Sequence, residues 1–203
     1  MKRSSTLALS IALGASALLA GCAPLLIGSA AGTVLVASDR RTAGTQLEDE
    51  TIELRAQSAI REQLGTRVRA DVTSYNRVAL VTGEVANAAD KQAVERIVSG
   101  VQNVRSVVNE LTVQSSPSLR DRSNDAIITG KVKASFIDAK VPVLAVKVTT
   151  ERGVVYLLGR VTAEEATRAT EAARSISGVQ RVVRLLEVIT QQELDRLQVV
   201  PKS

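Results

Sequence analysis

The chain contains an internal duplication, and this feature constrains its fold more than any local pattern does. Three short segments recur 76 to 78 residues further on: Val72-Thr73-Ser74 as Val148-Thr149-Thr150, Gly83-Glu84-Val85 as Gly159-Arg160-Val161, and Ser99-Gly100-Val101-Gln102 as Ser177-Gly178-Val179-Gln180. Self-similarity at a fixed period indicates two copies of one structural unit. Any fold assigned to the first copy must therefore also suit the second.

Each copy shows the pattern of a helix, two strands, a second helix and a third strand. Apolar residues four apart indicate one face of a helix, namely Ile52, Ala56 and Ile60 in the first copy and Ile128, Val132 and Phe136 in the second. Alternating residues then indicate paired strands, with hairpin turns at 76–77 and 151–153. The expected ranges that follow the first helix are strands 68–74 and 78–85, helix 88–99 and strand 104–113, and then strands 144–150 and 154–161, helix 163–177 and strand 182–189.

This order predicts an α+β fold with two tandem αββαβ units. Strand two, the second helix and strand three form a right-handed crossover, so strands two and three should be parallel. Each unit is then a three-stranded mixed sheet with two helices on one face. Gly100 and Gly178 stand where a helix needs a left-handed residue at its end.

The expected domains are residues 46–115 and 123–190. A unit of about 65 residues buries only around 60% of its unfolded surface, so we expect the two units to support each other. The segment 114–122 is too short and polar to predict structure of its own, and the tail 191–203 is expected to form one or two helical turns at 191–198.

The N-terminus resembles the signal of a bacterial lipoprotein. Lys2 and Arg3 precede an apolar run at 7–19, and Leu19-Ala20-Gly21-Cys22 ends in the only cysteine of the chain. The resemblance implies removal of residues 1–21 and acylation of Cys22, whose several acyl chains would form a lasting membrane anchor. Residues 22–45 would then be a lipidated N-terminus and tether.

The alternative for this region is an uncleaved transmembrane helix, because apolar character resumes at 23–37. Pro24, Gly28 and Gly32 interrupt that second run. Residues 7–19 alone are short for a span, which needs about 20 residues.

Composition argues against catalysis. The chain has no histidine, and its single cysteine is assigned to the anchor. Ser-His-Asp triads, Cys-His pairs and almost all transition-metal sites are therefore excluded, and no cofactor is expected. The adjacent Glu164 and Glu165 are better explained by a capping box with Thr162 than by a catalytic carboxylate pair. Without residues 1–21 the net charge is only +3, which does not suggest a nucleic-acid partner.

The αββαβ order, the glycines at 83 and 159 and the Ser-Gly-Val turn before the last strand resemble the BON domain. Two such units behind a lipoprotein signal resemble dual BON-domain outer-membrane lipoproteins associated with cell division and envelope stress; the segment 38–46 introduces the first unit, and Ser123-Asn124-Asp125 opens the second. This resemblance covers residues 19–189. It implies a periplasm-facing lipoprotein that supports envelope integrity, and Ala23 fits sorting to the outer membrane. It also implies that the second BON domain binds anionic phospholipid through its first helix.

The residues of the second unit suit such a contact. Residues 46–114 carry eight basic and ten acidic side chains, whereas residues 120–189 carry twelve basic and eight acidic ones. Helical spacing turns Ile127, Gly130 and Ala134 outward, with Lys131 and Lys133 on the flanks. An exposed isoleucine between lysines suits insertion at a lipid head-group surface. The candidate lipid-binding residues are Asn124, Ile127, Ile128, Gly130, Lys131, Lys133 and Ala134.

The first unit has the opposite character, because Glu48, Asp49, Glu50 and Glu53 crowd the start of its helix and would repel anionic lipid. Two alternatives stay open. In the first, Ile127 packs against the first unit and the lysines are ordinary surface residues. In the second, this face docks a periplasmic or outer-membrane protein. The lipid preference and the oligomeric state are also open.

Overall fold

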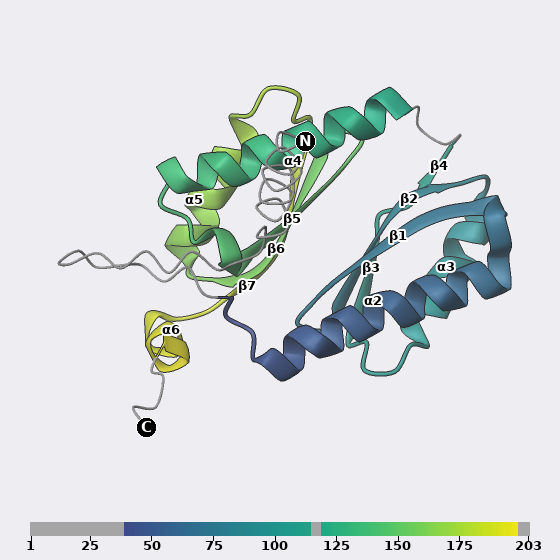
Figure 1. The fold of residues 1–203 in the computed structure, drawn as a ribbon, viewed down its shortest axis with the longest axis horizontal. Coiled ribbons are helices and arrows are strands. Elements are labelled where there is room, and N and C mark those ends of the chain that lie inside the picture. Colours follow the sequence, from purple (N-terminus) through teal and green to yellow (C-terminus); the bar gives the residue numbers. More distant parts are fainter. Residues whose placement is uncertain (1–38, 115–118, 199–203) are drawn as a thin grey trace, which may run out of the picture. The chain divides into compact units, whose positions relative to one another are not determined.

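The computed structural model describes residues 39–114 and 119–198, all of which belong to one compact unit. Both copies have the predicted order of elements (Figure 1). In the first copy the elements are α2 (Ala43–Leu64), β1 (Val68–Tyr75), β2 (Val78–Val85), α3 (Ala88–Ser99), β3 (Ser106–Asn109) and β4 (Thr112–Val113). In the second copy they are α4 (Leu119–Asp138), β5 (Val146–Glu151), β6 (Val154–Val161), α5 (Ala163–Arg174) and β7 (Arg181–Val188), followed by α6 (Gln191–Gln198).

The predicted sheet topology is confirmed in both copies. β1 pairs antiparallel with β2, and β5 with β6, while β2 with β3 and β6 with β7 are parallel. In each copy the two helices cover one face of the sheet (Figure 1). The core between them holds the predicted helix faces, with Ile52, Ala56 and Ile60 in one copy and Ile128, Val132 and Phe136 in the other.

The sheet faces that the helices leave uncovered pack against each other. We call this contact the seam. It is built on Tyr75 and Leu80 from the first copy and Tyr156 and Leu158 from the second, all at most 3% exposed. Polar contacts surround it: Lys147 binds Glu53 at 2.6 Å, and the Asn76 side chain donates to Glu187 at 2.6 Å. The expectation that the two units support each other is thus confirmed.

Several boundaries differ from the sequence prediction. α2 begins at Ala43 and α4 at Leu119, so the ends of the expected tether and linker are helical. The predicted strand 104–113 is divided into β3 and β4, because the Asn109 side chain accepts a hydrogen bond from the amide of Leu111. A 3₁₀ turn, Val143–Ala145, follows Pro142 and delays β5 to Val146. The tail helix lies at 191–198 as expected.

The two predicted left-handed glycines behave differently. Gly178 has φ +96°, as expected, although α5 already ends at Arg174, where Ser175 donates its hydroxyl to the Ala172 carbonyl. The prediction for Gly100 was wrong: its φ is −81°, and Asn103 takes the positive φ of 71° in this turn instead.

The duplicated glycines of the second strand have a steric role. A Cβ atom at Gly83 would overlap the backbone carbonyl oxygen of Arg69, and one at Gly159 would overlap that of Ala145. Gly83 also has φ +121°, which side chains rarely adopt. The chain segment opposite each of these glycines therefore lies too close to leave room for a side chain.

We expect Gly83→Ala and Gly159→Ala each to lower the free energy of unfolding by about 2 kcal/mol, because backbone must move to admit the methyl group. Gly130→Ala is the matched control. It meets nothing within 4 Å inside α4, and should stabilise by up to about 1 kcal/mol through helix propensity. Urea denaturation of the full chain measures all three. Equal stabilities for Gly83→Ala and the wild type would contradict the steric explanation.

Candidate membrane-contact site

The α4 helix is fixed to its sheet by one face, which leaves the opposite face available. Ile128, Val132 and Phe136 are at most 1% exposed and form the core under the helix. At the first turns, Asp125 accepts hydrogen bonds from the amides of Arg152 and Gly153 in the hairpin turn, at 2.7 and 2.8 Å. These contacts set the rotation of α4 about its axis and so determine which residues face outward.

The structure places six of the seven candidate residues on the surface. Asn124, Ile127, Gly130, Lys131, Lys133 and Ala134 are all exposed, and Ile127 is 56% exposed. An isoleucine with more than half of its surface exposed is not packed against the first copy, so that alternative is not supported. Ile128 is the exception. It is 1% exposed inside the core, so its inclusion among lipid-contacting residues was wrong.

The structure adds Ile137 to this face. It is 70% exposed and lies ten residues after Ile127, which is about 15 Å along the helix axis. Residues 127, 130, 134 and 137 repeat at helical spacing, so they form one apolar stripe, which we call the α4 stripe. The signal for Ile137 was present in the sequence as this spacing, but the prediction stopped at Ala134.

Lysines flank the α4 stripe on both sides. Lys131 and Lys133 are exposed, and neither forms an ion pair with another described residue. Their ammonium groups are therefore available to an external anion.

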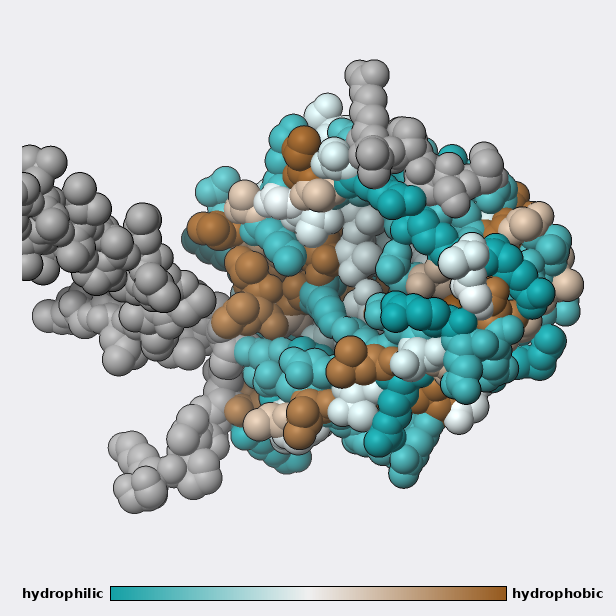
Figure 2. All heavy atoms as spheres, turned by 45° about the vertical axis from the view of Figure 1, so that its right-hand side comes forward, coloured by the Kyte–Doolittle hydropathy of each residue, from teal (hydrophilic) through white to brown (hydrophobic). Residues whose placement is uncertain are grey.

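Exposure alone does not define such a site. On the face drawn in Figure 2, apolar side chains lie as separate groups among hydrophilic ones, as is usual for protein surfaces. α2 also exposes two leucines, Leu47 and Leu54, seven residues apart. Glu48 and Glu50 adjoin them, however, and no lysine lies on α2. The cations of α2 are Arg55 and Arg61, on a helix that also carries five acidic residues, whereas on α4 a lysine lies on each side of the apolar stripe.

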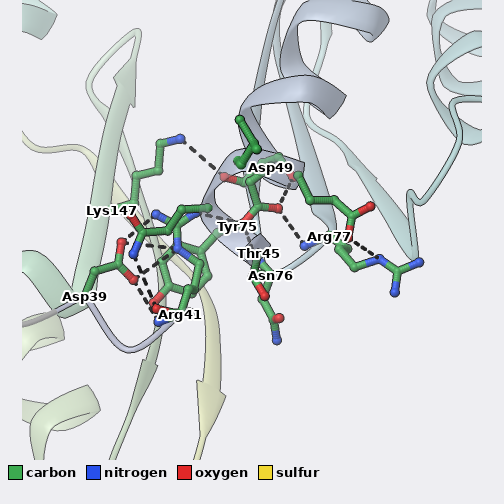
Figure 3. Close-up of polar contacts among 12 residues, drawn as sticks. Asp39, Arg41, Thr45, Asp49, Tyr75, Asn76, Arg77 and Lys147 are labelled. Atoms are coloured by element: carbon green, nitrogen blue, oxygen red, sulfur yellow. Dashed lines mark hydrogen bonds and ion pairs between the residues drawn. The ribbon is translucent and has the colours of Figure 1, made fainter. Parts of the chain in front are cut away.

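The two first helices share a further feature that sequence reasoning missed. Asp49 of α2 accepts hydrogen bonds from the amides of Asn76 and Arg77, both at 2.8 Å (Figure 3). Asp125 binds the hairpin turn of the second copy in the same way. Burial would raise the pKa of Asp49, but hydrogen bonds from Ser74, Arg77, Arg41 and Asn76 outweigh burial and hold it below its usual range. The 76-residue spacing of the two aspartates was the available signal.

Residues 39–41, which we call the strap, connect the start of α2 to both copies. Arg41 binds Asp49 at 2.7 Å and lies 4.2 Å from the ring centre of Tyr75 in the first copy (Figure 3). Arg40 reaches the second copy, where its two terminal nitrogens bind the two Glu165 oxygens at 2.7 Å and one also donates to the Arg160 carbonyl at 2.8 Å. The expected loop thus carries an inter-copy ion pair that no local pattern indicated.

Glu165 has two functions in this arrangement. With Thr162 it forms the predicted capping box of α5, and it is also the partner of Arg40. Burial would raise its pKa, but hydrogen bonds from Arg40 and the Thr162 amide outweigh burial and lower it. The structural explanation for the Glu164 and Glu165 pair is therefore confirmed for Glu165.

The comparisons with known proteins agree with this architecture. The BON domain model matches residues 48–115 and 124–190. The chain therefore belongs to the BON domain family, with one domain in each copy.

Three relatives are similar to the chain over most of its length. The chain is 39% identical over 184 residues to Outer membrane lipoprotein DolP of Haemophilus influenzae. The matched segment covers 89% of this chain and 95% of that protein. It is 29% identical to the 21 kDa hemolysin of Actinobacillus pleuropneumoniae, over 74% of this chain and 79% of that protein. It is 28% identical to Osmotically-inducible protein Y of Escherichia coli, over 72% of this chain and 76% of that protein.

The protein is accordingly an outer-membrane lipoprotein with two BON domains and a role at the envelope. Within the described ranges, none of its helices combines the length and apolar character needed to cross a bilayer. Cys22, the expected acylation site, lies outside the described residues.

We expect Arg40→Gln to lower the free energy of unfolding by about 3 kcal/mol at pH 7, because it leaves a buried carboxylate without its cation. The pKa of Glu165 is lower in the folded protein than its usual value of 4.5. The contribution of the ion pair to folding stability is therefore complete above pH 4.5 and is lost as the pH falls through the folded-state pKa. Urea denaturation should therefore show a smaller difference in the free energy of unfolding between the variant and the wild type at pH 3 than at pH 7.

Arg61→Gln is the matched control for this experiment. Arg61 is exposed on α2 and has no ion pair with another described residue, so its replacement should change stability by less than about 0.5 kcal/mol. An Arg40→Gln variant as stable as Arg61→Gln at pH 7 would show that the strap contributes nothing.

Proposed function

We propose that the protein is held at the outer membrane by acylated Cys22 and contacts anionic phospholipid on the periplasmic face through the α4 stripe of its second BON domain. In this role it is non-enzymatic and supports the integrity of the envelope. The observation that carries the proposal is the α4 stripe, an exposed apolar row between two lysines that have no ion-pair partner among the described residues.

The arrangement fits a helix lying in the plane of a lipid head-group layer. Ile127 and Ile137 would enter the apolar boundary about 15 Å apart. Gly130 and Ala134 between them are small, which lets the helix backbone approach the surface closely. Lys131 and Lys133 would lie at head-group level, where each contributes about 1 kcal/mol near an anionic surface.

The charge difference between the copies supports the assignment to the second domain. The segment 120–189 has a net charge of +4, against −2 for the segment 46–114. The acidic start of α2 would be repelled by the surface that attracts α4.

The first test reverses the two charges. The chain from residue 22 with Cys22→Ser cannot be acylated, so its binding to vesicles reports the domains alone. Lys131→Glu with Lys133→Glu should weaken binding to anionic vesicles at least about 30-fold at low salt, as two lost contributions of about 1 kcal/mol predict. Binding is measured by vesicle co-sedimentation.

Arg174→Glu with Arg184→Glu is the matched control, because it makes the same charge change on two exposed arginines of the second domain that are not on α4. It should retain most of the binding. Unchanged vesicle binding by the lysine variant would overturn the proposal and favour a docking surface for an envelope protein.

A second test removes the apolar contribution. Ile127→Ser with Ile137→Ser should reduce binding to anionic vesicles about tenfold or more, since both side chains lose their transfer into the apolar boundary. Leu47→Ser with Leu54→Ser makes the same kind of change at a pair of similarly exposed leucines on α2 and should leave binding unchanged. Equal losses in the two double variants would contradict a specific role for α4.

A further inference from the structure

The seam contains a cluster in which one arginine binds carboxylates of both copies. The Arg69 Nε of β1 donates to Glu84 Oε2 of β2 at 2.6 Å. The Nη2 of the same side chain donates to Glu151 Oε1 at the end of β5, and its Nη1 donates to Asp71 at 2.9 Å. Arg69 therefore links Glu84 in the first copy to Glu151 in the second.

Glu84 is incompletely satisfied in this cluster. Its side chain is 1% exposed, and its Oε1 accepts no hydrogen bond from the described residues. The nearest cation of the other copy is Arg152, whose Nη1 is 3.7 Å away. That distance is too long for a hydrogen bond. A buried carboxylate oxygen without a donor is costly, so this atom needs a donor from its surroundings.

Glu151 can supply that donor when it is protonated. Burial raises the pKa of the Glu151 carboxyl to about 7, Arg69 opposes this rise, and the charge and hydrogen bonding of Glu84 add to it. The charged groups around Glu151 are Arg69 and Asp71 from β1, Glu84 from β2, Arg152 from the hairpin turn and Asp125 from α4. With Glu151 itself included, the cluster holds two arginines and four carboxylates, an excess of negative charge that one bound proton reduces.

We propose that Glu84 and Glu151 share one proton and act as a proton-dependent latch between the two BON domains. In the closed form, protonated Glu151 donates its O–H to Glu84 Oε1 while Arg69 binds both carboxyl groups. When the pH rises, Glu151 releases the proton to solvent, the two carboxylates repel each other and Glu84 Oε1 loses its donor. The inference concerns the seam and does not depend on lipid binding by α4.

The direction of the pH effect follows from the raised pKa. The folded protein binds the proton of Glu151 more tightly than the unfolded chain does, so stability falls as the pH rises from the usual value of 4.5 to about 7. Asp49 and Glu165 have the opposite effect on stability, because their lowered pKa values favour folding at higher pH.

The test is an NMR titration of side-chain carboxyl carbons in the non-acylated chain between pH 4 and pH 9. We expect a transition near pH 7 at Glu151, with a coupled shift at Glu84. Amide hydrogen exchange of Leu80 and Leu158, corrected for intrinsic rates, should be several-fold faster at pH 8.5 than at pH 5.5 because the latch is open.

Glu151→Gln should abolish both effects, since its amide can donate to Glu84 without titrating. Seam exchange at pH 8.5 should then be several-fold slower than in the wild type. Glu53→Gln, which removes the carboxylate partner of Lys147 at the same seam, is the matched control and should keep the transition near pH 7.

Glu84→Gln provides a second variant, in which Glu151 should titrate well below pH 7 because its carboxylate neighbour is gone. Titration of Glu151 near 4.5 in the wild type would overturn the latch. A transition near pH 7 that persists in Glu151→Gln would overturn it as well.

Discussion

The apolar sheet face that each BON domain leaves uncovered is the constraint on which this structure depends. Two helices can cover only one face of a three-stranded sheet, and a copy of about 65 residues is only marginally stable when its other, apolar face is left in water. The duplication solves this by placing Tyr75 and Leu80 against Tyr156 and Leu158. The helices are then directed outward in both copies, which leaves the outer face of α4 available for a membrane contact.

Burial of the seam explains why its polar groups are so tightly organised. Lys147 with Glu53, Arg69 with Glu151 and Arg40 with Glu165 all join the two copies. Each pair is partly desolvated, so breaking it leaves a charge that water solvates poorly. The strap and the proposed proton latch both result from this burial. Arg40 of the strap supplies the cation that buried Glu165 needs, whereas buried Glu84 depends on a proton for its missing hydrogen bond.

Much of this fold follows from the sequence, because the duplication allowed each element to be identified twice. The hairpins, the parallel crossover and the inward residues Ile128, Val132 and Phe136 follow from periodicity and turn chemistry. The contacts of Arg40 do not, since its partner lies 125 residues away and nothing local distinguishes it from a loop arginine. Gly100 was predicted to be left-handed because it stands at the end of the predicted helix 88–99, yet Asn103 takes the left-handed conformation instead. At the candidate site, Ile127 and the lysines were predictable from helical spacing, and Ile137 lay one step further along the same face.

The comparison of the copies shows how one fold acquires two surfaces. Asp49 and Asp125 hold the first helix of each copy to its hairpin in the same way, so the outward faces correspond. One face presents leucines beside glutamates, and the other presents isoleucines beside lysines. The chemistry of the two faces therefore favours α4 for the proposed membrane contact, while the shared scaffold explains why both faces are exposed.

The most direct measurement of this claim is a backbone NMR titration of the wild-type, non-acylated chain with short-chain anionic or zwitterionic phospholipid. The account predicts that amide shifts gather on residues 124–137 of α4 with the anionic lipid and are absent with the zwitterionic one. Shifts on α2, equal shifts with both lipids, or no shifts at all would contradict it.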